Sequence, residues 1–159
     1  MISATEPDWA REIPANSPSK KLLKALRDYQ KYCSKGPAFF LLKVLAVLRH
    51  RTWSIITGAD IPINCKIGGG LLLPHPNGVV IHSDAEVGPN CLIFQQVTIG
   101  ARGEFIPKIG GHVDIGAGAK VLGKIKVGDH AKIGANAVVL DTVPVGATAV
   151  GIPAKIIDN

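Results

Sequence analysis

Branched aliphatic residues recur every six positions along most of this chain, and no other feature constrains the fold as strongly. The longest series contains seven residues: Ile109, Ile115, Val121, Val127, Ile133, Val139 and Val145. Two shorter series keep the interval: Ile81, Val87, Ile93 and Ile99, and then Ile61, Ile67 and Leu73. An α-helix has about 3.6 residues per turn, so it would spread these side chains around its circumference. The interval is also too long for simple strand alternation.

A six-residue period fits a short strand followed by a tight turn. Three such units make one coil of about 18 residues, and coils stack at the strand spacing of about 4.8 Å. Each aliphatic side chain then points to the axis of a prism, and a glycine directly after it, such as Gly110 or Gly116, allows the turn. The repeat predicts an all-β solenoid over residues 55–157, a parallel β-helix of hexapeptide repeats. Periodicity leaves the hand of the coil open.

Residues 1–54 lack this repeat and are expected to form a short α-helical cap. Four apolar residues after Ser17-Pro18-Ser19 share one helical face: Leu22, Leu23, Leu26 and Tyr29. Gly36-Pro37 ends that helix, and a second, apolar helix is expected over roughly residues 38–50. We expect this cap to cover the open end of the prism, because unpaired strand edges invite aggregation.

Composition excludes several classes of protein. Aromatic residues make up 5% of the chain and the net charge is a mild +6, with no long basic run, so we expect no nucleic-acid partner. The apolar run 39–48 is too short to span a bilayer, the N-terminus lacks the apolar segment of a signal peptide, and no membrane partner is expected. Cys33, Cys65 and Cys91 form no CxxC pair, so buried free thiols in the cytoplasm are expected.

Two interruptions of the repeat mark loops, and loops on a solenoid carry function. Leu73 and Ile81 are eight residues apart, which leaves two extra residues around Pro74-His75-Pro76-Asn77-Gly78. Ile99 and Ile109 are ten apart, which leaves four extra residues within 101–108. His75 lies in the first interruption, and Asp60 precedes it by 15 residues, close to one coil. A histidine whose ring is held by a carboxylate can act as a general base.

Several segments resemble the serine O-acetyltransferase family over about residues 53–156. The resemblance rests on these residues: Asp60-Ile61-Pro62, Lys66-Ile67-Gly68-Gly69-Gly70, His75-Pro76-Asn77-Gly78, Val97-Thr98-Ile99-Gly100, Pro107-Lys108-Ile109-Gly110, Ile115-Gly116-Ala117-Gly118-Ala119-Lys120 and Gly151-Ile152-Pro153-Ala154. It implies a left-handed β-helix and an acyltransferase that uses acetyl-CoA and works as a homotrimer. The family's catalytic histidine falls on His75, and its partner aspartate falls on Asp60.

Under this resemblance, CoA would lie in the groove between subunits. Backbone N–H groups near Gly100 and Ala101 are candidate donors to the oxyanion, because the second interruption would free them from the strand ladder. Small residues one coil apart, Ala117 and Ala135, would let pantetheine approach the backbone. Lys120 and Lys132 are candidates for contacting the phosphates. No metal is expected.

The chain departs from the family where the acceptor binds. Pro74 stands where the family has an aspartate, and Phe105-Ile106 stand where it has an Arg-His pair. Free serine carries an ammonium and a carboxylate that need partners, and apolar Phe105 and Ile106 supply none. Asn77 is a further candidate contact to the acceptor. L-serine, used in cysteine biosynthesis, is the acceptor that the resemblance names. A complex with cysteine synthase is not expected, because the family's C-terminal tail ends in isoleucine and this chain ends in Ile157-Asp158-Asn159.

Three alternatives stay open. The same machinery could acetylate a sugar or another small hydroxyl compound, as in exopolysaccharide pathways. A trimeric zinc protein resembling gamma-type carbonic anhydrases would use His112 and His130, which are 18 residues apart and so stack on neighbouring coils, with His82 as a third ligand. A non-catalytic CoA-binding scaffold is the third alternative.

Overall fold

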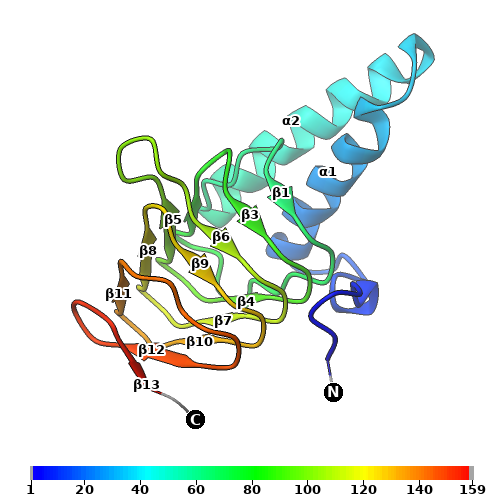
Figure 1. The fold of residues 1–159 in the computed structure, drawn as a ribbon. Helices are drawn as coiled ribbons and strands as arrows, with labels where there is room; N and C mark the ends of the chain where they lie inside the picture. The colour runs from blue at the N-terminus through cyan, green and yellow to red at the C-terminus, as the bar shows by residue number, and fades with distance from the viewer. Residues whose placement is uncertain (1, 158–159) are drawn as a thin grey trace.

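The computed structural model describes residues 2–157 and has the solenoid that the repeat predicts (Figure 1). Two helices come first, α1 (Pro18–Cys33) and α2 (Phe40–Thr57), each preceded by a short 3-10 helix, η1 (Trp9–Arg11) and η2 (Pro37–Phe39). Short strands follow: β1 (Lys66–Ile67), β2 (Val80–Ile81), β3 (Glu86–Val87), β4 (Leu92–Ile93), β5 (Thr98–Gly100), β6 (Lys108–Ile109), β7 (Asp114–Ile115), β8 (Lys120–Leu122), β9 (Lys126–Val127), β10 (Lys132–Ile133), β11 (Val138–Val139), β12 (Thr148–Val150) and β13 (Lys155–Ile157).

The strands form three parallel sheets, which are the three faces of the prism. Face 1 contains β2, β5, β8 and β11, face 2 contains β1, β3, β6 and β9, and face 3 contains β4, β7, β10 and β12. Strand β13 closes face 3 by pairing antiparallel with β12. In-register pairs such as Ile99 with Val121 and Ile109 with Val127 stack one repeat on the next. The chain therefore passes corner 3/1, corner 1/2 and corner 2/3 in each coil.

The residues of the six-residue repeat form the core, with one exception. Ile93, Ile99, Ile115, Val121 and Val127 are fully buried, but Val145 is 69% exposed. Val143 is buried in its place and pairs with Val127. The last coil is thus two residues shorter than expected, and the repeat continues from Val143 to Ala149. The prediction for Val145 is wrong because the sequence keeps the interval there by chance.

The glycines that follow the core aliphatics serve close packing, and the turn itself is made two residues later. A Cβ on Gly116 would lie 2.6 Å from the backbone nitrogen of Ala135 in the next coil. The left-handed residue at that corner is Gly118, with φ of 73°, and His112 and Asn136 play the same part at other corners. The expectation that the first glycine allows the turn is therefore corrected. Its small size lets neighbouring coils approach.

The helices keep their predicted order but extend beyond the predicted ends. Ser17 caps α1 by accepting a hydrogen bond from the Lys20 N–H, and Pro18 occupies the first turn. Helix α2 runs to Thr57 and ends at Gly58, a left-handed C-cap with φ of 66°. The expected boundary between residues 54 and 55 therefore falls inside α2, and the first coil begins after Gly58.

Helix α1 covers the open end of the solenoid, whereas most of α2 does not. Leu22, Leu23 and Leu26 are buried in one cluster with Ile61 and Ile67 of the first coil. On α2 only Ala46, His50 and Thr57 are buried. The second helix lies along α1 and leaves much of its apolar surface exposed. The expectation that the whole helical segment acts as a cover thus holds for α1 alone.

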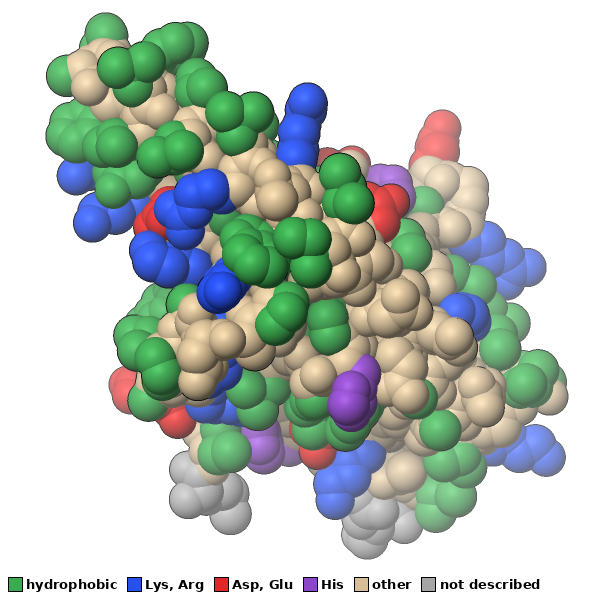
Figure 2. Space-filling view, turned by 180° about the vertical axis from the view of Figure 1, so that it is seen from behind, with side chains coloured by type: hydrophobic (Ala, Val, Ile, Leu, Met, Phe, Trp, Pro, Cys, Tyr) green, Lys and Arg blue, Asp and Glu red, His purple; other side chains and the backbone are tan. Residues whose placement is uncertain are grey.

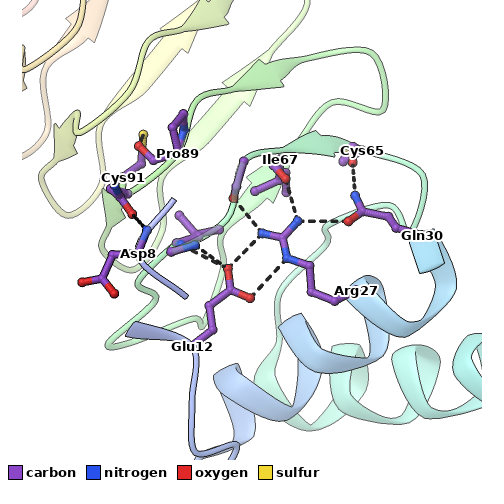
Figure 3. A network of polar contacts seen from close by, with 12 residues as sticks. Asp8, Glu12, Arg27, Gln30, Cys65, Ile67, Pro89 and Cys91 are labelled. Carbon is purple, nitrogen blue, oxygen red and sulfur yellow. Dashed lines mark hydrogen bonds and ion pairs between the residues drawn. The ribbon is translucent and has the colours of Figure 1, made fainter. Parts of the chain in front are cut away.

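A buried ion pair fastens this cap to the first coil (Figure 3). The Glu12 carboxylate, 7% exposed, lies 2.9 Å from Nη2 of Arg27 and accepts hydrogen bonds from the N–H groups of Gly70 and Leu71. The Arg27 guanidinium also donates to the carbonyls of Ile67 and Gly68, both at 2.6 Å. These contacts satisfy backbone groups at the open edge of the solenoid, which no further coil can pair.

The cysteines divide into two classes. Cys65 and Cys91 are buried in the core, and burial raises the pKa of each thiol to about 11. Cys33 lies at the end of α1 and is exposed, so the expectation of a buried thiol is wrong there. It hydrogen-bonds Tyr29 and raises the pKa of that phenol.

Candidate functional site

The His75 loop lies at corner 3/1, between Leu73 and β2. Three hydrogen bonds fix its backbone: the N–H of Gly78 donates to Gly58 (2.8 Å), that of Val79 to Pro76 (3.1 Å), and that of Gln96 to Asn77 (2.9 Å). His75 is exposed and sits between two prolines. A loop tied to α2, to itself and to the next coil holds this imidazole at the surface, where a substrate can reach it.

A hollow beside His75 adds residues that the sequence analysis missed. It has a volume of about 390 Å³ and lies between the His75 loop, the start of α1 and the end of α2. Ser17 and Ser19 line it, with their hydroxyl oxygens 3.2 Å apart, and so does Asn77. Only Ser17-Pro18 could have pointed to this position, since it marks a helix N-terminus. The hollow offers hydroxyl and amide groups to a small polar molecule next to the histidine.

Asp60 lies on the same end of the solenoid as His75. Its N–H donates to Val79 (2.8 Å), and its carbonyl accepts from Ile81 (3.0 Å), so it runs beside the strand that follows the His75 loop. Its side chain is exposed. Within residues 2–157, no hydrogen bond or ion pair joins Asp60 to His75. The pairing of these two side chains therefore stays a prediction.

The small residues proposed for CoA lie below His75 on the same corner. Hydrogen bonds follow this column from coil to coil: Gly118 N–H donates to Gln95, and Asn136 N–H donates to Ala117, both at 2.8 Å. Ala117 and Ala135 occupy successive coils of the column. The column is narrow enough in side-chain volume for an extended chain to approach the backbone, which is the fit that pantetheine needs.

The two lysines proposed for the phosphates differ. Lys120 reaches back to this column, where its Nζ donates to the Gln96 carbonyl (2.7 Å) and to the Thr98 hydroxyl (3.1 Å). Lys132 is exposed on face 3, in register with Asp114. Of the two, Lys120 is the one that the structure brings to the His75 corner.

The second interruption lies at a different corner from the first. Residues 101–107 form a hairpin closed by reciprocal hydrogen bonds between Arg102 and Phe105, and it projects at corner 1/2, between β5 and β6 (Figure 1). Phe105 is half exposed beneath Lys124, whereas Ile106 packs against the core and offers little surface to an acceptor. Face 1 separates Phe105 from His75 within one chain.

Gly100 stays in the strand ladder, contrary to the expectation that the interruption frees it. It pairs with Leu122, and its carbonyl accepts from the Gly123 N–H at 3.2 Å. The hairpin begins at Ala101, which is exposed. Of the two proposed oxyanion donors, only Ala101 lies beyond the paired strands.

Two of the three histidines considered for zinc stack as expected. Nδ1 of His112 lies 2.8 Å from Nδ1 of His130 at corner 2/3, a different corner from that of His75. His82 instead lies beside Asp84, with 4.0 Å between Nδ1 and the carboxylate. Across the described part of the chain, no three His, Cys, Asp or Glu side chains gather in a metal-binding arrangement. The trio proposed for zinc is therefore not brought together within one chain.

Comparisons with known proteins agree with this architecture. The family model for bacterial transferase hexapeptide repeats (six repeats) matches residues 106–141. A serine acetyltransferase of Helicobacter pylori (strain J99) is 46% identical over 123 residues, which are 75% of this chain and 70% of that protein. The chain belongs to the serine acetyltransferase family. Members of this family are acyltransferases.

Solved structures of the family share the fold. Soybean serine acetyltransferase complexed with serine has a TM-score of 0.76 at 37% identity, over 89% of this chain and 58% of that chain. A serine acetyltransferase in complex with CoA has a TM-score of 0.76 at 35% identity, over 94% and 60%. The expected left-handed β-helix is confirmed. This chain spans about three fifths of the length of these two proteins.

Proposed function

We propose that this protein transfers the acetyl group of acetyl-CoA to the hydroxyl group of L-serine. The observation that carries the proposal is the likeness over 89% and 94% of this chain to family members solved with serine and with CoA. The exposed His75, beside a polar hollow and above a column of small residues, supplies the groups that this reaction needs.

The proposed chemistry is direct transfer with His75 as general base. Acetyl-CoA supplies the acetyl group as a thioester. The imidazole takes the proton of the acceptor hydroxyl as that oxygen bonds to the carbonyl carbon, and it returns the proton to the sulfur as the carbon–sulfur bond breaks. Asp60 would orient the imidazole and stabilise its charged form. The Ala101 N–H is the proposed donor to the oxyanion.

We further propose that the site forms between copies of the chain in a homotrimer. His75 and the Phe105 hairpin lie at opposite edges of face 1, so one chain cannot bring both to one acceptor. In a cyclic trimer each contact is heterologous, so one corner of a protomer meets a different corner of the next. The His75 corner of one copy would then face the hairpin of its neighbour.

A second acceptor class is supported by the half-exposed Phe105. An apolar side chain at this place suits a larger and less charged acceptor than free serine, such as a sugar. The deciding experiment is kcat/KM for L-serine beside a panel of sugars and amino-acid derivatives, with release of the CoA thiol as the readout. Serine acetylation is supported by a value of about 10⁴ M⁻¹s⁻¹ or more for serine, and it is contradicted if a sugar exceeds serine.

Variants test the residues. His75→Ala should lower kcat by about 10²-fold or more and leave CoA affinity unchanged, because the side chain is exposed and packs little. Asp60→Asn should lower kcat less. His82→Ala is the matched control and should retain activity. Loss of activity in the control with retention in His75→Ala would refute the assignment.

Mixing experiments test the shared site. Phe105→Asp, which places a carboxylate in the acceptor wall, should be inactive like His75→Ala. Mixed protomers of these two variants should recover about a quarter of wild-type activity, because that share of sites combines an intact histidine with an intact hairpin. No recovery in trimers shown to be mixed would place both groups in the same subunit's site and refute this arrangement.

A further inference from the structure

The hairpin of α1 and α2 projects from the end of the solenoid, and its far end, here called the hairpin tip (residues 31–48), is apolar and exposed (Figure 1). The exposed fractions on α2 are large for such side chains: Phe40 64%, Leu41 78%, Leu42 42%, Val44 38%, Leu45 50% and Leu48 56%. Figure 2 shows these side chains gathered on the projecting helices, with lysine and arginine side chains beside them. An apolar patch of this kind on a protein surface marks an interaction site.

The same hairpin carries the positive charge of the protein. Residues 18–57 contain nine Lys or Arg and one acidic residue, Asp28, which is a charge of +8, while the rest of the chain carries −2 of the total of +6. Arg27, Lys24 and Arg49 are occupied by Glu12 or Asp28. The remaining basic residues have no such partner among the described residues.

Three of these lysines lie at the tip over aromatic rings. The Nζ atoms of Lys31, Lys35 and Lys43 are 5.8 Å, 4.7 Å and 5.5 Å from the ring centres of Tyr32, Phe39 and Tyr29. None of the three pairs with a carboxylate in residues 2–157. Lysines whose stems follow apolar surface while their ammonium groups stay in water are typical of helices that lie in a membrane interface.

We propose that the hairpin tip docks on an anionic lipid bilayer surface. The apolar side chains would enter the region between headgroups and acyl chains, and the lysines would contact the headgroups. None of the helices in residues 2–157 has the length and apolar character needed to cross a membrane. Docking on the surface requires only an apolar face and nearby positive charge. The expectation of no membrane partner considered spanning alone.

Charge separates this occupant from a second copy of the chain. Leu41, Leu45 and Leu48 have the 4–3 spacing of a coiled-coil seam. A matching hairpin, however, would bring +8 against +8, with no acidic residue on α2 to pair across the contact. The apolar residues also cover a wider arc than a seam, since Phe40, Leu42 and Val44 flank it. An anionic surface meets the same side chains with attraction.

The experiment is flotation of the full chain with vesicles. Vesicles of phosphatidylcholine with about 30% phosphatidylglycerol should bind the protein at about 0.1 M NaCl, and pure phosphatidylcholine vesicles should bind it far less. At about 1 M NaCl the Debye length falls to about 3 Å, and binding should drop sharply. Each lysine at an anionic surface contributes about fivefold. The triple variant Lys31→Glu, Lys35→Glu, Lys43→Glu should therefore lose about 100-fold or more in partitioning.

A second variant tests the apolar part. Leu41→Ser with Leu45→Ser should reduce partitioning by about tenfold or more, since exposed leucines on this face leave folding unaffected. The matched control on the solenoid, Val145→Ser with Lys126→Glu, should bind as the wild type does. Circular dichroism and light scattering accompany each sample.

Several outcomes would overturn the proposal. These are a wild-type protein that does not float with anionic vesicles, binding equal to both vesicle types, or binding unchanged in the tip variants. An assembly that becomes smaller in Leu41→Ser/Leu45→Ser, with no vesicle binding by the wild type, would assign the tip to a second copy of the chain.

Discussion

Removing the Glu12 carboxylate should destabilise the protein more than any surface ion pair does. Glu12→Ala leaves the buried N–H groups of Gly70 and Leu71 without their acceptor, and it leaves Arg27 without its counter-ion. Each unsatisfied buried donor costs about 1–3 kcal/mol. Breaking a buried ion pair from one side costs about 3–5 kcal/mol. Arg27 keeps its bonds to two carbonyls, so we expect about 3–5 kcal/mol in total.

Urea unfolding at fixed protein concentration measures this loss. Trp9 reports on the same place, because its ring lies over Gly69 and 5.3 Å from the guanidinium of Arg27. Glu12→Gln should cost less, since its amide oxygen still accepts from the two N–H groups while the charge is gone. Lys24→Ala is the control, because the Lys24–Asp28 pair is 52% exposed on the lysine side and contributes about 0.5 kcal/mol or less.

A free-energy change below about 1 kcal/mol for Glu12→Ala, or one equal to that of Lys24→Ala, would refute the reasoning. It would mean that the N-terminal segment detaches without consequence. In that case water would satisfy the open edge of the first coil.

Three further predictions concern other parts of the fold. Cys33 alone should react with a thiol reagent in the native protein at neutral pH, and three thiols should react after unfolding, because the buried thiols have pKa values of about 11. Burial lowers the pKa of His50 from 6.5, so the unfolded state takes up a proton first as pH falls; stability should be full above pH 6.5 and decline below it, and His50→Leu should flatten that decline in urea melts. Gly116→Ala should lower Tm, since its Cβ would lie 2.6 Å from the Ala135 nitrogen, whereas Gly36→Ala, with open space around it, should not.

The repeat was predictable because it is local. A side chain such as Ile99 is buried when its neighbours six residues away are buried too, so spacing alone indicates the coil, the strand positions and most of the core. The two interruptions likewise show in the spacing, and with them the exposed loop that holds His75. Val145 is the exception, because a shortened last coil placed Val143 inside instead.

The site was only partly predictable. Spacing places Ala117 and Ala135 on one column, and the structure adds that this column lies below His75. It could not show that Lys120 reaches Gln96, since that contact depends on how two coils stack. It could not show the hollow with Ser17 and Ser19, which forms only where the helices meet the first loop.

The sequence by itself determined the solenoid, the helices, the family and the loop with its histidine. The tertiary structure decided which surfaces meet: that α1 covers the open end while α2 stays exposed, that Glu12 reaches Gly70 across 58 residues, and that His75 and Phe105 lie on different corners. Periodicity reports on neighbours within one or two coils. Which face of a helix is covered, and which corner a loop occupies, depends on contacts between distant segments, and those contacts leave no period in the chain.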